Sequence, residues 1–364
     1  MLITSGGFGM ITRKAIIEYD VNEIESNEIY LDESNLEETN DGDINSILDM
    51  MYRKNGISPL AMTWELTDKC NFECPFCYIH NHSTNPNKEQ FEYRFETIKP
   101  ELDELINHGL FICYLSGGEC LLHPDFEKIY LYLKTKGVLV AVLTNAALLS
   151  DDHVNIFRKY KPYKIEVSIY GVDTTFSKKT QMANKVLKNV LKLKNAGINV
   201  IAKMPRNNCT EREFEKVRAW CEKNDIEFFY SNELFNGYDD TDNSIYQSDI
   251  DERNDIRERK WGYKKVFDCP AGKHSFVLSY DGKVRPCFAF YEKKTPEWSF
   301  SIEHGIITAF NRMKNKVESI SGKRLKHCKG CERSNQCQEC IATQCVADDV
   351  ESYMKHKCME NNFI

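Results

Sequence analysis

Apolar positions recur along residues 58–235 in two alternating patterns, short buried runs and longer amphipathic stretches. The short runs predict strands, and the longer stretches, several of which end at glycine, predict helices. The predicted strands are 60–66, 110–116, 138–144, 164–170, 198–204 and 226–231. The predicted helices between them are 95–106, 125–137, 151–160, 183–197 and 211–224. Such alternation requires parallel strands with helical crossovers, so it predicts an α/β fold, either an open doubly wound sheet or a barrel or partial barrel.

The chain on either side of this region follows other patterns. Residues 1–57 form an N-terminal extension with a strand-like pattern at 8–19 and a helical pattern at 44–54. Residues 19–45 hold ten Asp or Glu and no Lys or Arg. Two interpretations stay open for this extension, a cap over the next domain and a small docking module for a peptide substrate. Residues 236–265 predict a polar linker, and 266–364 a cysteine-rich domain with a hairpin turn at Asp281-Gly282.

Composition excludes several classes of protein. The 364 residues carry a formal net charge of −7, which gives no electrostatic basis for binding nucleic acid or an anionic membrane surface. No apolar run approaches the roughly 20 residues that a membrane-spanning helix needs. The N-terminus lacks the basic-then-apolar layout of a secretory signal. We therefore expect a cytoplasmic protein with neither a nucleic-acid nor a membrane partner.

Fifteen cysteines are unusual for such a chain. Thiols stay reduced in the cytoplasm, so clustered cysteines there are more often metal ligands or catalytic groups than disulfides. Cys70, Cys74 and Cys77 directly follow the first predicted strand, where the sites of parallel α/β proteins gather. Because a 4Fe–4S cluster binds one thiolate at each iron, three cysteines would leave one iron for a substrate or cofactor. Buried thiols, or three zinc ligands with a distant fourth, are the alternatives.

This loop resembles the cluster motif of radical S-adenosylmethionine (SAM) enzymes, with Phe76 as the aromatic residue before the last cysteine. The segment "YLSGGECLLHPDF" at 114–126 is similar to the Gly-Gly-Glu segment of that family. The resemblance implies that Cys70, Cys74 and Cys77 hold the SAM-binding cluster. It also implies SAM contacts from residues on the loop and after the next strands, namely Phe76, Gly117, Gly118, Glu119, Asn145 and Ser168. Residues 172–184 lack the Arg that many relatives place there, and Lys178 or Lys179 would substitute for it.

The C-terminal cysteines resemble the SPASM extension of radical SAM enzymes, which carries two auxiliary 4Fe–4S clusters. The resemblance implies an outer cluster on Cys328, Cys331, Cys337 and Cys358. It implies an inner cluster on Cys269, Cys287 and Cys340, with Cys345 as an extra candidate. Cys337 and Cys340 are separated by two residues where the family usually has three. The inner cluster therefore has either an open iron or full ligation, and paired Cys-x2-Cys steps also fit zinc.

The resemblance implies a partial (β/α)6 TIM-like barrel at 58–235 and a SPASM domain at 266–364. It implies an enzyme that reductively cleaves SAM and abstracts a hydrogen from a peptide, forming a thioether or carbon–carbon crosslink. The expected partners are a precursor peptide and a flavodoxin- or ferredoxin-type electron donor. Phe288 stands where sulfatase-maturing members place Asp, which disfavours that activity. Two alternatives stay open, a radical dehydrogenase of small molecules and a non-catalytic metal-bearing interaction protein.

Overall fold

The computed structural model describes residues 44, 47–49, 51–53, 56–79, 93–173, 182–206, 210–231, 269–288, 290 and 296–321. The predicted linker, most of the N-terminal extension and the cysteines from Cys328 onward lie outside these residues. The described residues divide into two compact units. The first holds those from 61 to 231, and the second those from 44 to 60 and from 269 to 321, apart from 279–281.

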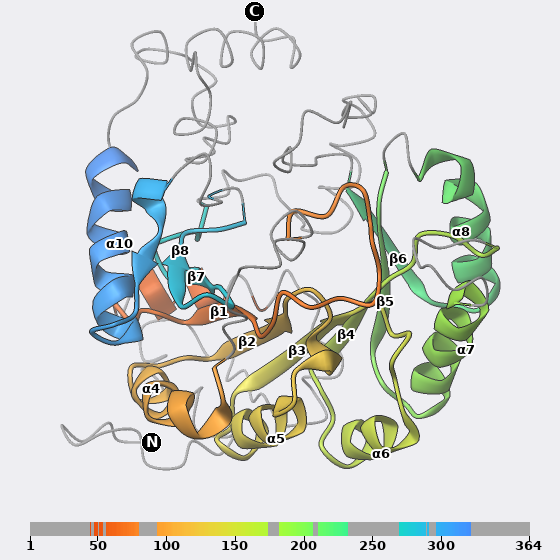
Figure 1. Ribbon diagram of the computed structural model, residues 1–364, viewed down its shortest axis with the longest axis horizontal. Coiled ribbons are helices and arrows are strands. Elements are labelled where there is room, and N and C mark those ends of the chain that lie inside the picture. The colour runs from red at the N-terminus through yellow and green to blue at the C-terminus, as the bar shows by residue number, and fades with distance from the viewer. Residues whose placement is uncertain are drawn as a thin grey trace, which may run out of the picture. The chain divides into compact units, whose positions relative to one another are not determined.

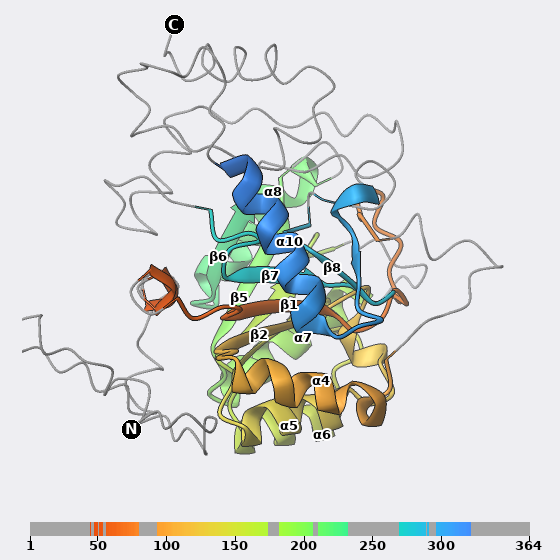
Figure 2. The ribbon, with the colours of Figure 1, turned by 90° about the vertical axis from the view of Figure 1, so that its left-hand side faces the viewer.

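The first unit contains a parallel sheet of six strands in chain order. These are β1 (Ala61–Glu65), β2 (Ile112–Ser116), β3 (Leu139–Thr144), β4 (Lys164–Ser168), β5 (Val200–Pro205) and β6 (Glu227–Ser231). The helices that connect them are α4 (Phe95–Asn107), α5 (Phe126–Thr135), α6 (Asp151–Lys159), α7 (Met182–Asn195) and α8 (Glu211–Lys223). Figure 1 shows the helices along one side of the curved sheet, and in Figure 2 α4, α5 and α6 lie together on that side. The predicted α/β fold is confirmed as a partial, TIM-like barrel.

The two faces of this sheet differ in polarity because side chains alternate along each strand. One set is apolar and fully buried, and it includes Cys113, Leu115, Val140, Val142, Ile165 and Val167. The helices need an apolar surface to pack on, so this set faces them. The opposite set carries charge, with Glu166 on β4 aligned beside Ile201 on β5 and Leu143 on β3. The sheet therefore presents its polar groups on the side away from the helices.

Polar contacts fix the helices at their ends and edges. Ser150 caps α6, because its hydroxyl accepts from the His153 N–H at 3.1 Å and His153 Nδ1 accepts from the Ser150 N–H at 3.2 Å. On α4, Asp103 accepts hydrogen bonds from Tyr132 of α5 and from Lys99 at 3.0 Å. Partial burial raises the pKa of Asp103, but these donors and Lys136 outweigh it and hold the pKa at about 2.

The second unit is built around a hairpin of β7 (Ser275–Leu278) and β8 (Lys283–Arg285), with β9 (Phe300–Ser301) paired to β8. The predicted turn is confirmed, and Gly282 adopts a φ of 73° there. Cys269 precedes β7 and Cys287 follows β8, so the antiparallel pairing puts both at the same end of the hairpin. A short turn, η3 (Pro296–Trp298), precedes β9.

One helix of this unit, α10 (Ile306–Ser321), is absent from the sequence prediction. It packs against β8 and β9 and buries Ile306, Phe310, Met313 and Val317. Gly272 allows the close packing, since a Cβ there would stand 2.5 Å from Val317 Cγ2. Among the described residues, no helix is both long enough and apolar enough to cross a membrane.

Candidate active site

The cysteine loop leaves the end of β1 and turns tightly. The Cys77 N–H donates to the Cys74 carbonyl at 3.0 Å, and the Phe72 N–H donates to the Cys70 sulfur at 3.4 Å. Cys70 is exposed, Cys77 is half-buried and Cys74 is buried. The thiol of Cys74 interacts electrostatically with both other thiols, so the structure brings the three together.

The Gly-Gly-Glu segment after β2 is bonded directly to the start of this loop. The Gly118 N–H donates to the Thr67 carbonyl and the Glu119 N–H to the Lys69 carbonyl, both at 2.8 Å. A Cβ on Gly117, whose φ is +130°, would stand 2.5 Å from the Thr67 oxygen. A Cβ on Gly118 would stand 2.3 Å from the Lys69 oxygen. Both glycines are therefore required where two backbone segments meet.

The Glu119 side chain is fully buried and joins this segment to the end of β3. Its Oε1 accepts from the Thr144 hydroxyl at 2.6 Å and from the Leu121 N–H at 3.2 Å. Its Oε2 accepts from the Asn145 N–H at 2.7 Å. Burial raises the pKa of Glu119, and the hydrogen bonds that it accepts oppose that rise.

Asn145 follows β3 and reaches the cysteine loop. Its Nδ2 donates to Asn71 Oδ1 at 2.8 Å and lies 3.9 Å from the Cys70 sulfur. Its Oδ1 accepts from the Ala147 N–H at 2.9 Å, which fixes the orientation of the amide. The residue predicted after the third strand is thus in contact with Cys70, the first cysteine of the loop.

The segment after β4 also reaches the cysteine loop, through Tyr170. The Tyr170 hydroxyl interacts electrostatically with Ser168 and with the Cys74 thiol. The Tyr170 ring meets Phe76 edge-on, with the ring centroids 5.2 Å apart. Burial raises the pKa of Tyr170, and the nearby Cys74 adds to the rise. The predicted residues from β1, β2, β3 and β4 therefore converge at one edge of the sheet.

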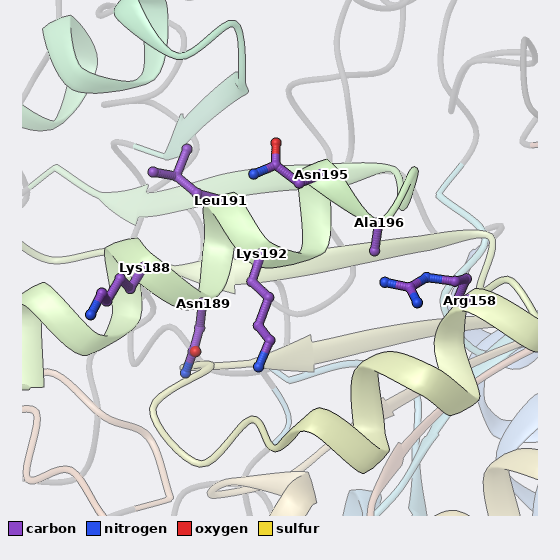
Figure 3. A pocket seen from close by; sticks show the side chains of 7 residues that line it. All are labelled: Arg158, Lys188, Asn189, Leu191, Lys192, Asn195 and Ala196. Carbon is purple, nitrogen blue, oxygen red and sulfur yellow. The ribbon is translucent and has the colours of Figure 1, made fainter.

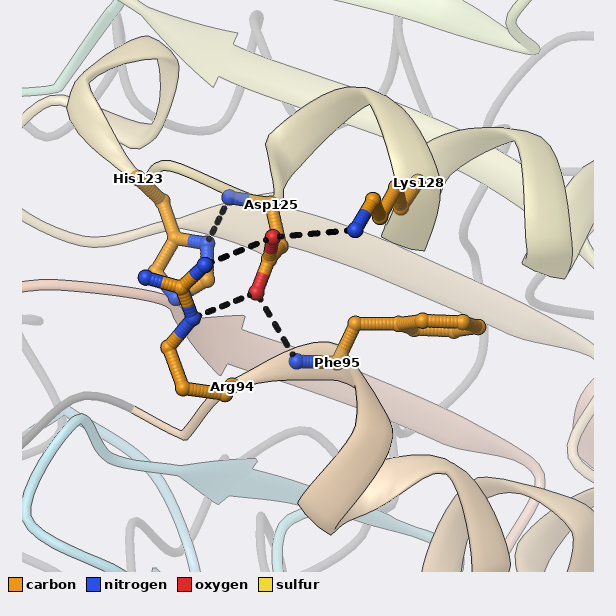
Figure 4. Close-up of polar contacts among 5 residues, drawn as sticks. All are labelled: Arg94, Phe95, His123, Asp125 and Lys128. Atoms are coloured by element: carbon orange, nitrogen blue, oxygen red, sulfur yellow. Dashed lines mark hydrogen bonds and ion pairs between the residues drawn. The ribbon is translucent and has the colours of Figure 1, made fainter.

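An ion pair outside this centre connects the starts of α4 and α5 (Figure 4). The Arg94 guanidinium donates two hydrogen bonds, of 2.7 and 3.1 Å, to the buried Asp125 carboxylate. The same carboxylate accepts from the Phe95 N–H at 3.1 Å, while His123 Nδ1 accepts from the Asp125 N–H at 3.1 Å. Burial raises the pKa of Asp125, but the Phe95 and Arg94 donors lower it overall. The contact holds the helix after the cysteine loop against the segment that follows Gly-Gly-Glu.

Comparison with known families identifies this arrangement. Residues 64–220 match the model of the radical SAM superfamily, a span that includes the cysteine loop and the ends of β2, β3 and β4. Over these residues the chain has the signature of the radical SAM superfamily. Within it, the chain is related to SPASM-type peptide maturases.

Two relatives from Bacillus subtilis illustrate that relation. The antilisterial bacteriocin subtilosin biosynthesis protein AlbA is 27% identical over 64% of this chain and 55% of its own length. The sporulation killing factor maturation protein SkfB is 24% identical over 63% of this chain and 60% of its own length. The chain therefore spans less than two thirds of either relative.

The fold has solved counterparts. The crystal structure of Streptococcus suis SuiB bound to SAM matches with a TM-score of 0.61, at 15% identity, over 86% of this chain and 82% of SuiB. SuiB has also been solved with the precursor peptide SuiA, and that structure matches with a TM-score of 0.60, at 15% identity, over 85% of this chain and 77% of SuiB.

The donor set of this radical SAM protein fits a 4Fe–4S cluster on three cysteines. Cys70 is exposed, and partial desolvation raises the pKa of its thiol to about 11. Burial raises the pKa of Cys74 further. Thiols in this state ionise on binding a metal. No three His, Cys, Asp or Glu side chains in the described ranges converge on a single ion, whereas a cluster spreads its thiolates over separate irons.

The structure adds site residues that the sequence did not indicate. Tyr170, Thr144 and Asn71 join the predicted residues through the contacts above. Tyr78, directly after Cys77, donates to the buried Glu65 at the end of β1 at 2.9 Å. The sequence gives only a weak signal for this pair, because a Glu or a Tyr beside a cysteine loop is also common at strand ends that have no site.

The polar face of the sheet holds a buried group of charges. The Glu166 carboxylate binds Lys164 at 2.8 Å and also pairs with Lys203. Burial raises the pKa of Glu166, but the two lysines outweigh it and lower the pKa overall. Lys203 is aligned with Ser168 in the β4–β5 pairing. This face therefore supplies fixed charge beside the β4 part of the site.

A groove of about 530 Å³ lies elsewhere, between α6 and α7 (Figure 3). It is lined by Arg158 of α6 and by Lys188, Asn189 and Lys192 of α7. Asn189 Nδ2 donates to the Ala146 carbonyl at 2.7 Å, and Lys192 pairs with Asp151. The groove lies among the helices, whereas the predicted site residues lie at strand ends.

Several predicted residues lie outside the described residues. These are Lys178, Lys179 and the six cysteines Cys328, Cys331, Cys337, Cys340, Cys345 and Cys358. Of the predicted auxiliary ligands, Cys269 and Cys287 are described, and both are half-buried. The auxiliary clusters therefore stay a prediction.

Proposed function

We propose that this protein is a SAM-dependent maturase of a ribosomally made peptide. The observation that carries the proposal is the direct bonding of the Gly-Gly-Glu segment to the cysteine loop, through the Gly118 and Glu119 N–H groups. This bonding puts backbone that lacks side chains, at Gly117 and Gly118, next to three thiols at the carboxyl edge of the sheet. Such a juxtaposition suits a cofactor that must contact a cluster and the protein backbone at once.

One group of the predicted site residues would bind the cluster, and another would bind SAM. Cys70, Cys74 and Cys77 would bind three irons, and the backbone at Gly117 and Gly118 would receive SAM beside the fourth. The hydroxyl of Ser168, the amide of Asn145 and the ring of Phe76 would border the same cofactor. When bound, the cluster and SAM supply radical chemistry that side chains lack. The protein orients the cofactor and keeps water out.

We propose that the second unit carries the two auxiliary clusters. Cys269 and Cys287 at one end of the hairpin, together with Cys340 and Cys345, would hold the inner cluster. Cys328, Cys331, Cys337 and Cys358 would hold the outer one. Each cluster would accept or return single electrons, so a flavodoxin- or ferredoxin-type protein of the cytoplasm is the expected donor.

A peptide substrate is supported by the relatives. AlbA and SkfB are named for bacteriocin biosynthesis and killing-factor maturation, and SuiB has been solved with a precursor peptide. We propose the same substrate class here, with a thioether or carbon–carbon crosslink as the product. Either bond removes two hydrogens from the peptide, one leaving as a hydrogen atom and the other as a proton with an electron. The N-terminal extension would dock the precursor.

Anaerobic reconstitution tests the cofactor part of the proposal. The intact protein should bind about twelve irons and about twelve sulfides, and a Cys70/Cys74/Cys77→Ala triple variant should bind about eight of each. Cys113→Ala and Cys221→Ala, which alter buried thiols away from the loop, should keep the full complement. Zinc without labile sulfide would overturn the assignment.

A second experiment tests the substrate. The reconstituted protein is incubated with SAM, a reductant and the short peptide encoded beside its gene, and the peptide is weighed by mass spectrometry. A decrease of about two mass units per crosslink is expected, matched by 5′-deoxyadenosine formation. SAM cleavage that leaves every such peptide unchanged would overturn the peptide assignment and leave the cofactor assignment standing.

A further inference from the structure

The Glu119 carboxylate has two alternative roles in the proposed SAM site. The family resemblance predicts that it contacts the SAM amino group. The structure shows both oxygens inside the protein, where Oε1 accepts from Thr144 and Leu121 and Oε2 accepts from Asn145. The exposed fractions of Glu119, Thr144 and Asn145 are 0%, 5% and 6%, so the carboxylate faces protein and not solvent.

We infer that Glu119 is a positioning residue, a clasp between the β2 and β3 loops, and that its carboxylate makes no contact with SAM. Its hydrogen bonds of 2.6 and 2.7 Å are short and charge-assisted, which are properties of a strong structural contact. To reach a ligand, the carboxylate would have to leave the Thr144 hydroxyl and the Asn145 N–H unpaired in a buried place, which is unfavourable.

The clasp has a defined target, the amide of Asn145. Glu119 holds the Asn145 backbone, and the Asn145 side chain reaches Asn71 Oδ1 at 2.8 Å and lies 3.9 Å from the Cys70 sulfur. Thr144 orients the same segment, since its Oγ1 accepts from the Ala146 N–H at 2.9 Å. Glu119 thereby holds a hydrogen-bond donor near a cluster sulfur, an arrangement that tunes iron–sulfur clusters.

A double-mutant cycle separates the clasp from a direct contact. The variants are Glu119→Gln, Thr144→Val and the double substitution, each reconstituted with iron and sulfide. Equilibrium dialysis against SAM measures affinity, and electron paramagnetic resonance of the reduced cluster without SAM reports on the surroundings of Cys70. Thr144 is buried and has no predicted contact with SAM, and its hydroxyl donates to Glu119 and accepts from the Ala146 N–H of the same segment. Its effect on SAM affinity is therefore the deciding quantity.

We expect Glu119→Gln and Thr144→Val each to weaken SAM binding by about fivefold, and the double variant to be no weaker than the weaker single variant. Both single variants should alter the resonance spectrum in the same way. Thr144→Ser, which keeps the hydroxyl, should bind SAM within about twofold of the parent. Thr135→Val, the same chemical change at the far end of α5, should leave both readouts unchanged. Thr144→Ala, which lacks the same hydroxyl, serves as a second measurement if Thr144→Val does not fold.

The inference rests on the proposed SAM site, and the two fail differently. If the parent protein binds no SAM, the proposed function is wrong. If the parent binds SAM and Thr144→Val binds it as tightly while Glu119→Gln does not, Glu119 contacts SAM directly and the clasp is overturned. Effects that multiply in the double variant would overturn it as well.

Discussion

Replacing Gly118 with alanine should damage both the fold and the proposed cofactor site. The added Cβ would stand 2.3 Å from the Lys69 carbonyl oxygen and 2.7 Å from the Asp68 carbonyl oxygen. Both neighbours are backbone atoms, so no side chain can rotate to relieve the clash. The Gly-Gly-Glu segment and the cysteine loop must separate by about 1 Å to restore an ordinary carbon–oxygen contact.

The expected loss of stability follows from that separation. Overpacking of this kind lowers stability by about 1–3 kcal/mol, and weakening the two 2.8 Å hydrogen bonds to Thr67 and Lys69 adds about 1 kcal/mol. Gly118→Ala should therefore lower the unfolding free energy of the cluster-free protein by about 3 kcal/mol. Urea titration followed by circular dichroism measures this loss, and equilibrium dialysis after reconstitution measures SAM binding.

A glycine in open surroundings provides the control. Gly197 has a φ of +72° and nothing within 4 Å of an added Cβ, so Gly197→Ala should lose only about 1 kcal/mol through backbone strain and should bind SAM normally. If Gly118→Ala had the same effects as Gly197→Ala on stability and on SAM binding, the close approach of the two backbones would not explain why position 118 is glycine.

Three further substitutions and one control test contacts away from the cysteine loop. Ser150→Ala removes the cap of α6 and should lower the unfolding free energy by about 1 kcal/mol in urea titration, and no change would contradict the cap. Asp125→Asn should lower it by about 2 kcal/mol at neutral pH, whereas Lys128→Gln, which removes a 3.7 Å exposed contact, should change it by under about 0.5 kcal/mol. Equal effects would refute the bidentate pair. The folded-state pKa of Asp103, about 2, lies below its usual 3.8, so its contribution is full above about pH 4 and disappears as the pH falls toward 2. The stability difference between the parent and Asp103→Asn should shrink on acidification over that range, and a growing difference would refute the sign.

Sequence periodicity located every strand and connecting helix of the first unit to within a few residues. It succeeded because those strands are buried and parallel, and several of the helices between them end at glycine, so each apolar run has one role. It did not locate α10, although Ile306, Phe310, Met313 and Val317 follow helical spacing. The cysteines on either side of this stretch, Cys287 and Cys328, indicate metal ligation more strongly than a single apolar stripe indicates a helix.

The site was less predictable than the fold. Spacing and family resemblance predicted the cysteines and glycines, because a cluster loop and a close backbone approach restrict the residue type. The Thr144, Tyr170 and Asn71 contacts could not be predicted, since a hydroxyl or amide at a strand end has many possible partners. The direction of the Glu119 carboxylate also depends on how two loops pack, which no local pattern encodes.

The chain order of β1 to β6 has a consequence for biosynthesis. Because the parallel strands β1 to β6 lie side by side in chain order, that part of the sheet can assemble one strand–helix unit at a time as the chain leaves the ribosome. The cysteine loop, the glycine pair and the Glu119 contacts all lie between residues 66 and 145. This half of the site therefore leaves the ribosome ahead of Ser168 and Tyr170, and the three thiols can meet β2 and β3 before the later strands join the sheet.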